Sequence, residues 1–103
     1  MDEIIILLEK LNFSKTEVAV YIDLLKNSSS NGYKIAKNLN ISRSSVYSAL
    51  DNLYNKGIVL LMLGDSQVYK VENPSVLINK MKNEFNETAD ALDFKLKVQR
   101  ILS

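Results

Sequence analysis

Between Ser42 and Gly57 the sequence gathers side chains that can hydrogen-bond to the base edges and phosphates of a nucleic acid. Hydroxyl and amide groups both donate and accept, and a guanidinium can bond a phosphate or a guanine through two parallel hydrogen bonds. Serines also collect at helix starts for capping alone, so an ordinary surface helix is the competing interpretation. The candidate residues are Ser42, Arg43, Ser44, Ser45, Tyr47, Ser48 and Asn52.

An amphipathic helix is expected to carry these side chains. Ser42 suits the N-cap because its hydroxyl can accept from a free first-turn amide, and Gly57 suits a left-handed stop. Asp51 falls on the polar face, where it would repel a phosphate or accept from a cytosine amine. The buried face, at the i, i+3, i+4, i+7 spacing of a helix, consists of Val46, Ala49, Leu50 and Leu53.

A shorter helix over about residues 32–38 completes a helix-turn-helix. Asn31 or Ser30 can cap it, and residues 39–41 form the tight connection to the next helix. Ala36 faces the crossing, where its small side chain lets the helices approach closely. Two short helices joined in this way, the second with a polar outer face, are typical of DNA-binding proteins. Further DNA contacts are expected from Asn31, Lys34 and Lys37.

Another helix is predicted over residues 15–26. Ser14 and Glu17 have the spacing of a capping box at its start. The polar segment 27–32, rich in Ser and Asn, predicts a turn before the helix-turn-helix.

A β-hairpin is expected after Gly57. Residues 58–63 are apolar and β-prone, Gly64–Asp65 is a turn pair, and residues 67–72 alternate between two faces. This hairpin would form a wing, with Lys70 as a further DNA contact. Pro74 then suits the first turn of the last helix, where its missing amide is not needed.

Two predicted helices carry more apolar residues than the core of the helix-turn-helix and its hairpin needs. In residues 2–11 they cover nearly the whole circumference, and in residues 75–102 they form a narrow stripe typical of a partnered helix. We expect both to join a homodimer contact; folding of the long helix back onto its own domain is the alternative. The expected interface is Ile4, Ile5, Leu8, Ile78, Met81, Phe85, Ala89, Leu92, Leu96 and Gln99.

The expected fold class is mainly α with a small β-hairpin wing. A winged helix-turn-helix DNA-binding domain would occupy residues 1–74, with residues 1–13 as an N-terminal helix packing on the dimer helix. A long coiled-coil-like dimerisation helix would occupy residues 75–103.

The residue types present exclude several functions. With no Cys and no His among 103 residues, the chain lacks thiolate zinc ligands, disulfides and the commonest general base. No base, nucleophile and orienting group stand at a recognisable spacing, so we expect neither an enzyme nor a cofactor or metal. The short apolar run behind an acidic start predicts a soluble, cytoplasmic protein without a membrane partner.

Charge is distributed unevenly along the chain. Residues 1–29 carry net charge −2, residues 30–70 carry +3, and residues 71–103 are balanced. The helix-turn-helix segment is therefore the basic part, which is a weak electrostatic indication of a nucleic-acid partner.

In the order of its elements and in several short motifs the chain resembles the TrmB-type winged-helix transcription regulators. Glu17 and Tyr21 occupy the family's "L-x-x-x-E-x-x-x-Y" entry segment. Residues 32–37 resemble its small-x-x-Ile-Ala segment, residues 41–47 its "Val-Pro-Arg-Ser-x-Val-Tyr", and residues 50–59 its "Leu-x-x-Leu-x-x-Lys-Gly-Leu-Val". Tyr69 and Pro74 match the residues that leave the wing.

The resemblance implies which residues meet DNA. The helix over 75–102 corresponds to the family's linker and dimer helix. Because the chain ends where the family's sugar-binding domain would begin, we expect no sugar-binding domain and identify no small-molecule effector. The residues that the resemblance places against DNA are Arg43, Ser44, Ser45, Tyr47 and Ser48.

The function expected is sequence-specific binding of double-stranded DNA by a homodimeric transcription regulator. The alternative is a winged-helix module that binds protein within the transcription machinery, because fold alone does not fix function. DNA binding should need no metal or metabolite.

Overall fold

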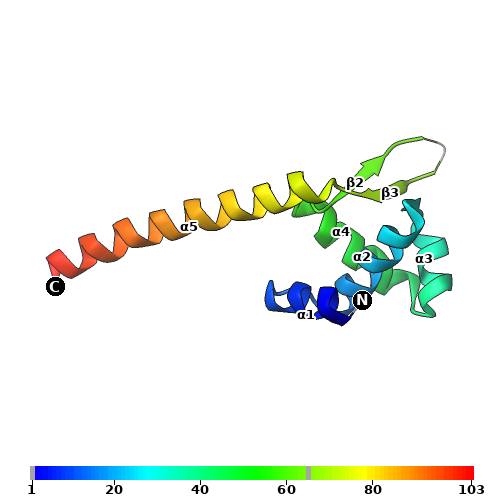
Figure 1. Ribbon diagram of the computed structural model, residues 1–103, viewed down its shortest axis with the longest axis horizontal. Coiled ribbons are helices and arrows are strands. Elements are labelled where there is room, and N and C mark those ends of the chain that lie inside the picture. The colour runs from blue at the N-terminus through cyan, green and yellow to red at the C-terminus, as the bar shows by residue number, and fades with distance from the viewer. Residues whose placement is uncertain (1, 65) are drawn as a thin grey trace. The chain divides into compact units, whose positions relative to one another are not determined.

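The computed structural model describes residues 2–64 and 66–103, which form two compact units divided between residues 72 and 73 (Figure 1). Six of the seven elements in the first unit are of the type, helix or strand, that the sequence predicts. The first unit contains α1 (Asp2–Lys10), α2 (Lys15–Asn27), β1 (Ser29–Ser30), α3 (Gly32–Leu39), α4 (Arg43–Asn55), β2 (Val59–Met62) and β3 (Val68–Val71), and the second is α5 (Pro74–Leu102).

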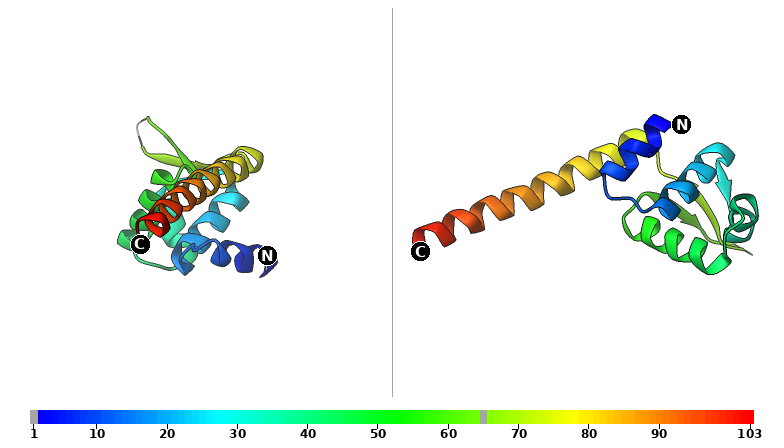
Figure 2. Two further views of the ribbon diagram at one scale, coloured as in Figure 1. Left: turned by 90° about the vertical axis from the view of Figure 1, so that its left-hand side faces the viewer. Right: turned by 90° about the horizontal axis from the view of Figure 1, so that it is seen from below.

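The core of the first unit lies among α2, α3, α4 and the sheet, which gather into one body with the hairpin at its edge (Figure 2). The helical spacing of α2 predicts a core face of Val18, Tyr21, Ile22 and Leu25, but two of the central residues, Val20 and Leu24, lie off that face. They are buried because α2 contacts α3, α4 and β3 and so has protein on several sides. The largest fully buried side chains are Leu24, Ile35, Leu50, Leu53, Val20, Val46 and Val59.

The sheet has three antiparallel strands in the order β1–β3–β2. Ser29 pairs with Lys70 and Ser30 with Tyr69, so the prediction that residues 27–32 form only a turn is wrong. Serine has little β preference of its own, and these two residues are extended because the free edge of β3 pairs with them. The expected turn at Gly64–Asp65 lies partly outside the described residues.

Local capping fixes where the helices begin, as the sequence predicts. Ser14 Oγ accepts from the amide of Glu17 at 3.1 Å, and Glu17 Oε1 accepts from the amide of Ser14 at 2.8 Å, which completes the capping box. Asn73 Oδ1 accepts from the amide of Ser75 at 2.9 Å, next to Pro74 in the first turn of α5. Gly57 has φ 74°, the left-handed conformation expected just after α4.

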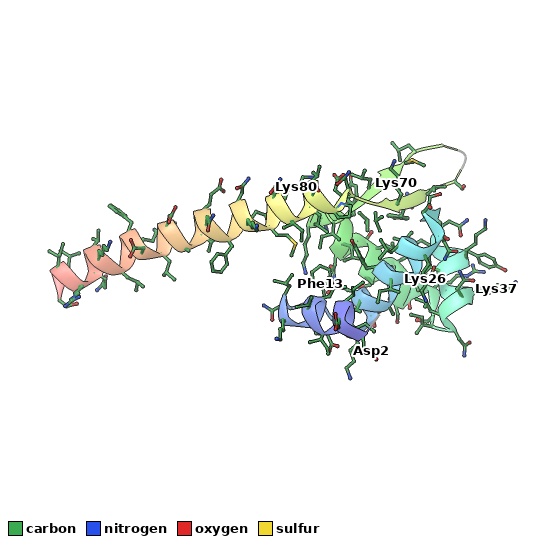
Figure 3. The ribbon with its side chains drawn as sticks, viewed as in Figure 1. Asp2, Phe13, Lys26, Lys37, Lys70 and Lys80 are labelled. Atoms are coloured by element: carbon green, nitrogen blue, oxygen red, sulfur yellow. The ribbon has the colours of Figure 1, made fainter. Side chains whose placement is uncertain are left out.

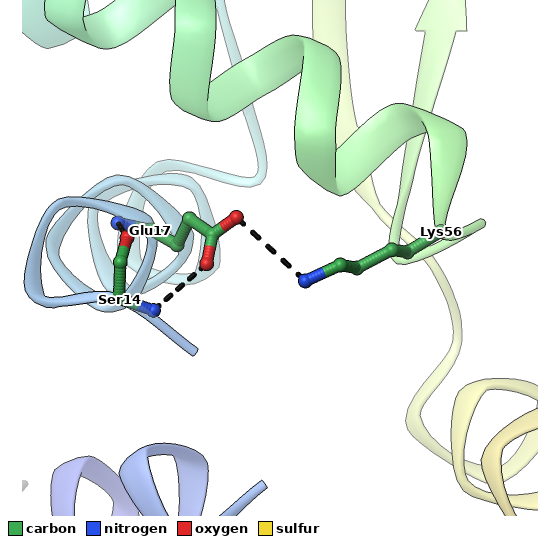
Figure 4. A network of polar contacts seen from close by, with 3 residues as sticks. All are labelled: Ser14, Glu17 and Lys56. Atoms are coloured by element: carbon green, nitrogen blue, oxygen red, sulfur yellow. Dashed lines mark hydrogen bonds and ion pairs between the residues drawn. The ribbon is translucent and has the colours of Figure 1, made fainter. Parts of the chain in front are cut away.

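A polar contact ties the start of α2 to the end of α4 (Figure 4). Lys56 Nζ lies 3.8 Å from Glu17 Oε2 and 5.7 Å from the centre of the Phe13 ring. The Glu17 side chain is only 6% exposed, so Lys56 supplies the opposite charge that a nearly buried carboxylate needs. This contact joins the two helices on which the rest of the unit packs.

Most of the large apolar side chains of α1 and α5 are exposed. No residue of α1 is buried. In α5, Phe85 is 72% exposed, Leu92 55% and Leu96 59%, although they form one stripe of the helix. Neither α5 nor any other described helix is long and apolar enough to cross a membrane. The architecture predicted from sequence, a mainly helical chain with a hairpin wing and a long C-terminal helix, is confirmed.

Candidate nucleic-acid interface

The helix-turn-helix is formed by α3, a three-residue turn and α4. Asn40 adopts the left-handed conformation with φ 55°, and the amide of Ile41 donates to the carbonyl of Ala36 at 3.2 Å. Ser42 then caps α4, since its Oγ accepts from the amide of Ser45 at 3.2 Å. The turn therefore ends α3 and starts α4 within three residues, and Arg43 becomes the first helical residue of α4.

α4 presents a polar face with two different flanks. Its buried face is the one predicted, with Val46, Ala49, Leu50 and Leu53 all inside the core. One flank, with Arg43 and Tyr47, lies toward α3, and the other lies toward the start of α2. The exposed residues midway between the flanks are Ser44, Ser48, Asp51 and Asn55.

On the first flank, Arg43 stacks on an aromatic ring from α3. The guanidinium carbon of Arg43 lies 4.5 Å from the centre of the Tyr33 ring. Tyr33 is 50% exposed, so the ring holds one face of the guanidinium while its N–H groups stay open to a ligand. No sequence pattern links positions 33 and 43, because the contact exists only where α3 and α4 cross.

Tyr47 occupies the space that a glycine leaves open. A Cβ added to Gly32 would lie 2.5 Å from Cε1 and Cζ of the Tyr47 ring, closer than non-bonded carbon atoms approach. Gly32 thus positions the Tyr47 ring, whereas the sequence predicts it only as the start of a helix. Together Gly32 and Tyr33 fix the side chains of Tyr47 and Arg43 along one edge of α4.

The second flank borders a polar hollow of about 360 Å³ between α4 and the start of α2. Ser42 Oγ donates to Ser45 Oγ at 2.8 Å and lies 3.3 Å from Ser44 Oγ, so the first serines of α4 form a local hydroxyl network. The hollow is lined by Ser14, Thr16, Glu17, Ser44, Ser45, Ser48, Ala49 and Asn52. Four of the predicted DNA-binding residues therefore line this hollow: Ser45 and Asn52 from the second flank, and Ser44 and Ser48 from the middle of the polar face.

The other predicted DNA-binding residues lie around this region with different roles. Asn31 caps α3, since its Oδ1 accepts from the amide of Lys34 at 2.8 Å. Lys34 and Lys37 are exposed on α3, and Lys37 extends outward in Figure 3. Lys70 is exposed on β3, one residue from buried Tyr69, so it points to the opposite face of the sheet. Lys34 and Lys37 therefore lie within the helix-turn-helix, whereas Lys70 lies on the wing.

Tyr69 is buried on β3, and a charge on α4 affects the pKa of its hydroxyl. Burial, followed by the nearby Asp51 carboxylate, raises the pKa of the Tyr69 hydroxyl above its ordinary value of 10.0. Asp51 is thus close enough to the wing to affect it electrostatically while remaining exposed on the outer face of α4. No group of three acidic side chains among the described residues is arranged to hold a metal ion.

Residues 8–75 match the family model described as "Sugar-specific transcriptional regulator TrmB". Over 83 residues the chain is 29% identical to the HTH-type sugar sensing transcriptional regulator TrmBL1 of Pyrococcus furiosus. The aligned part makes up 81% of this chain and 24% of that protein, so the chain spans about a quarter of its relative's length.

Solved structures have the same arrangement of elements. The structure of TrmBL2, described as an archaeal chromatin protein with a novel mode of DNA binding, superposes with a TM-score of 0.81 at 18% identity, over 98% of this chain and 41% of that one. A possible transcriptional regulator from Methanosarcina mazei Go1 superposes with a TM-score of 0.66 at 22% identity, over 84% and 79%. At these identities the likeness shows the fold, that of winged-helix regulators.

Proposed function

Because this chain belongs to the TrmB family of transcriptional regulators, we propose that it binds double-stranded DNA sequence-selectively as a homodimer, with α4 in the major groove. The family and the fold are those of DNA-binding regulators, not of enzymes. Residues 1–74 would act as the DNA-binding domain and residues 75–103 as the dimerisation helix.

The placement of Arg43 is the observation that carries the proposal. Its guanidinium lies on the Tyr33 ring at the start of α4. A guanidinium held in this way loses less freedom when it bonds a phosphate or the two acceptors of guanine. The side chains that would supply base selectivity lie exposed along the same helix: Ser44, Ser45, Ser48 and Asn52.

The lysines would contribute affinity rather than selectivity. Lys34 and Lys37 on α3 would contact the phosphate backbone as point charges, because an ammonium cannot form the paired hydrogen bonds of a guanidinium. Asn31 and Ser42 keep their caps and would approach the backbone from the two helix starts. Lys70 would reach DNA only if the wing lies along the duplex.

The dimer is supported by the exposed apolar residues of the two terminal helices. The stripe of α5, with Ile78, Phe85, Leu92 and Leu96, has the spacing of a helix packed against another helix. Met81 and Ala89 lie on the same stripe, and Gln99 continues it. Ile4, Ile5 and Leu8 of α1 would add a second layer of contact.

Selection of bound sequences from a random duplex pool tests this function. We expect enrichment of an inverted repeat whose half-site centres are separated by about 10 base pairs or a multiple of that spacing. Binding without enrichment would contradict sequence selectivity and favour a chromatin-like role. No binding to any duplex would favour the alternative, a winged-helix module that binds protein.

A further inference from the structure

A mostly apolar groove of about 370 Å³ lies between α1, α2 and the end of α3, away from α4. Pockets that bind small molecules begin at about this size. Five of the residues that line it are apolar: Ile5, Val18, Ala19, Ile22 and Leu39. Four are charged: Glu9, Lys15, Asp23 and Lys26.

Asp23 is the unusual residue of this groove because it is only 8% exposed. Its Oδ1 accepts from Asn38 Nδ2 at 3.4 Å, a long hydrogen bond. Its Oδ2 is buried and receives no hydrogen bond from any described residue. An unpaired oxygen on a buried carboxylate is unfavourable, so a cation bound beside this carboxylate would be stabilised.

The lysines that line the groove do not neutralise Asp23 through an ion pair. Lys15 and Lys26 are exposed, and within the described part of the chain neither forms an ion pair with Asp23. Lys26 lies in the last turn of α2 (Figure 3). Glu9 adds a second negative charge on the α1 side. A ligand that enters the groove therefore meets apolar walls beside a carboxylate that forms no ion pair with either lysine.

We propose that this groove binds a small molecule made of an apolar body and a primary ammonium group, with the ammonium at the Asp23 carboxylate. A charge-assisted hydrogen bond to a carboxylate is stronger than one from a neutral hydroxyl. An anionic ligand of the same shape would be repelled by the buried Asp23 carboxylate, which the exposed Lys15 and Lys26 offset only in part. The proposal does not depend on DNA binding, since none of the lining residues is among the predicted DNA contacts.

Amide chemical shifts of the full-length, ¹⁵N-labelled chain provide the test. The probes are 2-phenylethylammonium, 2-phenylethanol and phenylacetate, which share an aromatic body and differ in the charge of the polar end. The ammonium should cause saturable shifts centred on Ala19, Ile22 and Asp23 and bind about tenfold more tightly than the alcohol. Phenylacetate should bind the most weakly of the three.

Substitutions test whether the preference for the ammonium comes from Asp23 and whether the probes bind in this groove. Asp23→Asn keeps the side-chain size but removes the charge, so the ammonium and the alcohol should then bind about equally. Asp2→Asn removes an exposed carboxylate of α1 and should change nothing, which controls for net charge. Ala19→Leu should fill the groove and weaken both probes.

Several results would overturn the proposal. These are no saturable shifts with the ammonium, equal binding of the three probes, shifts centred on residues outside the groove, or an unchanged preference in Asp23→Asn. The comparison of the three probes on the natural chain tests charge selectivity without any substitution.

Discussion

The guanidinium carbon of Arg43 lies 4.5 Å from the centre of the Tyr33 ring, which holds the first residue of α4 against α3. The contact joins the two helices of the helix-turn-helix at the point where α4 would enter a groove. Each residue is exposed, so the pair is available to a ligand.

Loss of the Tyr33 ring should weaken DNA binding without unfolding the protein. In Tyr33→Ala the guanidinium loses its aromatic support, an interaction of about 0.5–1 kcal/mol at an exposed site, so affinity should fall about two- to fivefold. Tyr33→Phe keeps the ring and should bind like the natural chain. Fluorescence anisotropy with a labelled duplex measures both. Equal affinity for Tyr33→Ala and the natural chain would show that the stacking does not prepare Arg43 for DNA.

Gly32→Ala should act through Tyr47. The added Cβ would meet the Tyr47 ring at 2.5 Å, and because this side chain is 39% exposed it can rotate away. The free energy of unfolding should therefore fall by less than about 1 kcal/mol, while DNA affinity falls because Tyr47 has moved.

A double-mutant cycle checks this coupling. In the background Tyr47→Ala, Gly32→Ala should have little further effect on DNA affinity, because the ring that it displaces is already absent. Additive losses in affinity would show that Gly32 acts by another route.

These side-chain relationships mark the limit of what the sequence alone predicts. Caps such as Ser14 with Glu17, and the stop at Gly57, depend on neighbours in the chain and were predicted correctly. The family resemblance is likewise confirmed. The strand Ser29–Ser30 and the contacts of Gly32 and Tyr33 depend on segments that meet only after folding. The assignment of DNA-binding and dimer residues stays a prediction.

The pair formed by Glu17 and Lys56 should stabilise the fold modestly. Lys56 is half exposed, so solvent screens its charge, and Lys56→Ala should lower the free energy of unfolding by about 0.5–1 kcal/mol. Glu17→Ala also removes the capping box and should lower it by about 1–2 kcal/mol.

Urea unfolding followed by circular dichroism measures both effects. The control is Lys97→Ala, which breaks the exposed pair of Lys97 with Asp93 and should change stability by less than about 0.5 kcal/mol. If Lys56→Ala were no more destabilising than this control, the contact between α2 and α4 would contribute nothing measurable.

A charge in the stripe of α5 should dissociate the proposed dimer. Leu92→Asp places a carboxylate where an apolar contact with another helix is expected, and the full chain should become monomeric. Asn83→Asp adds the same charge on the opposite side of α5 and should leave a dimer. Light scattering at matched concentrations distinguishes the two states. A natural chain that is already monomeric, or dimers in both variants, would contradict a dimer formed through this stripe.

The central claim is that Arg43 places α4 on DNA, and a salt titration of Arg43→Ala tests it most directly. The matched control is Arg100→Ala, which removes the only other arginine, near the end of α5. Arg43→Lys keeps the charge but loses the paired hydrogen bonds of the guanidinium. Affinity is measured on a selected duplex and on a random one.

If Arg43 reads a guanine, Arg43→Ala should lose about 1–3 kcal/mol on the selected duplex and relax the preference at one position per half-site. In that case Arg43→Lys should recover little. If Arg43 contacts a phosphate, both duplexes should weaken together and the salt slope should fall by about 1 per subunit. Either result, with Arg100→Ala unchanged, is the one predicted. Unchanged affinity of Arg43→Ala on both duplexes would contradict the placement of α4 on DNA.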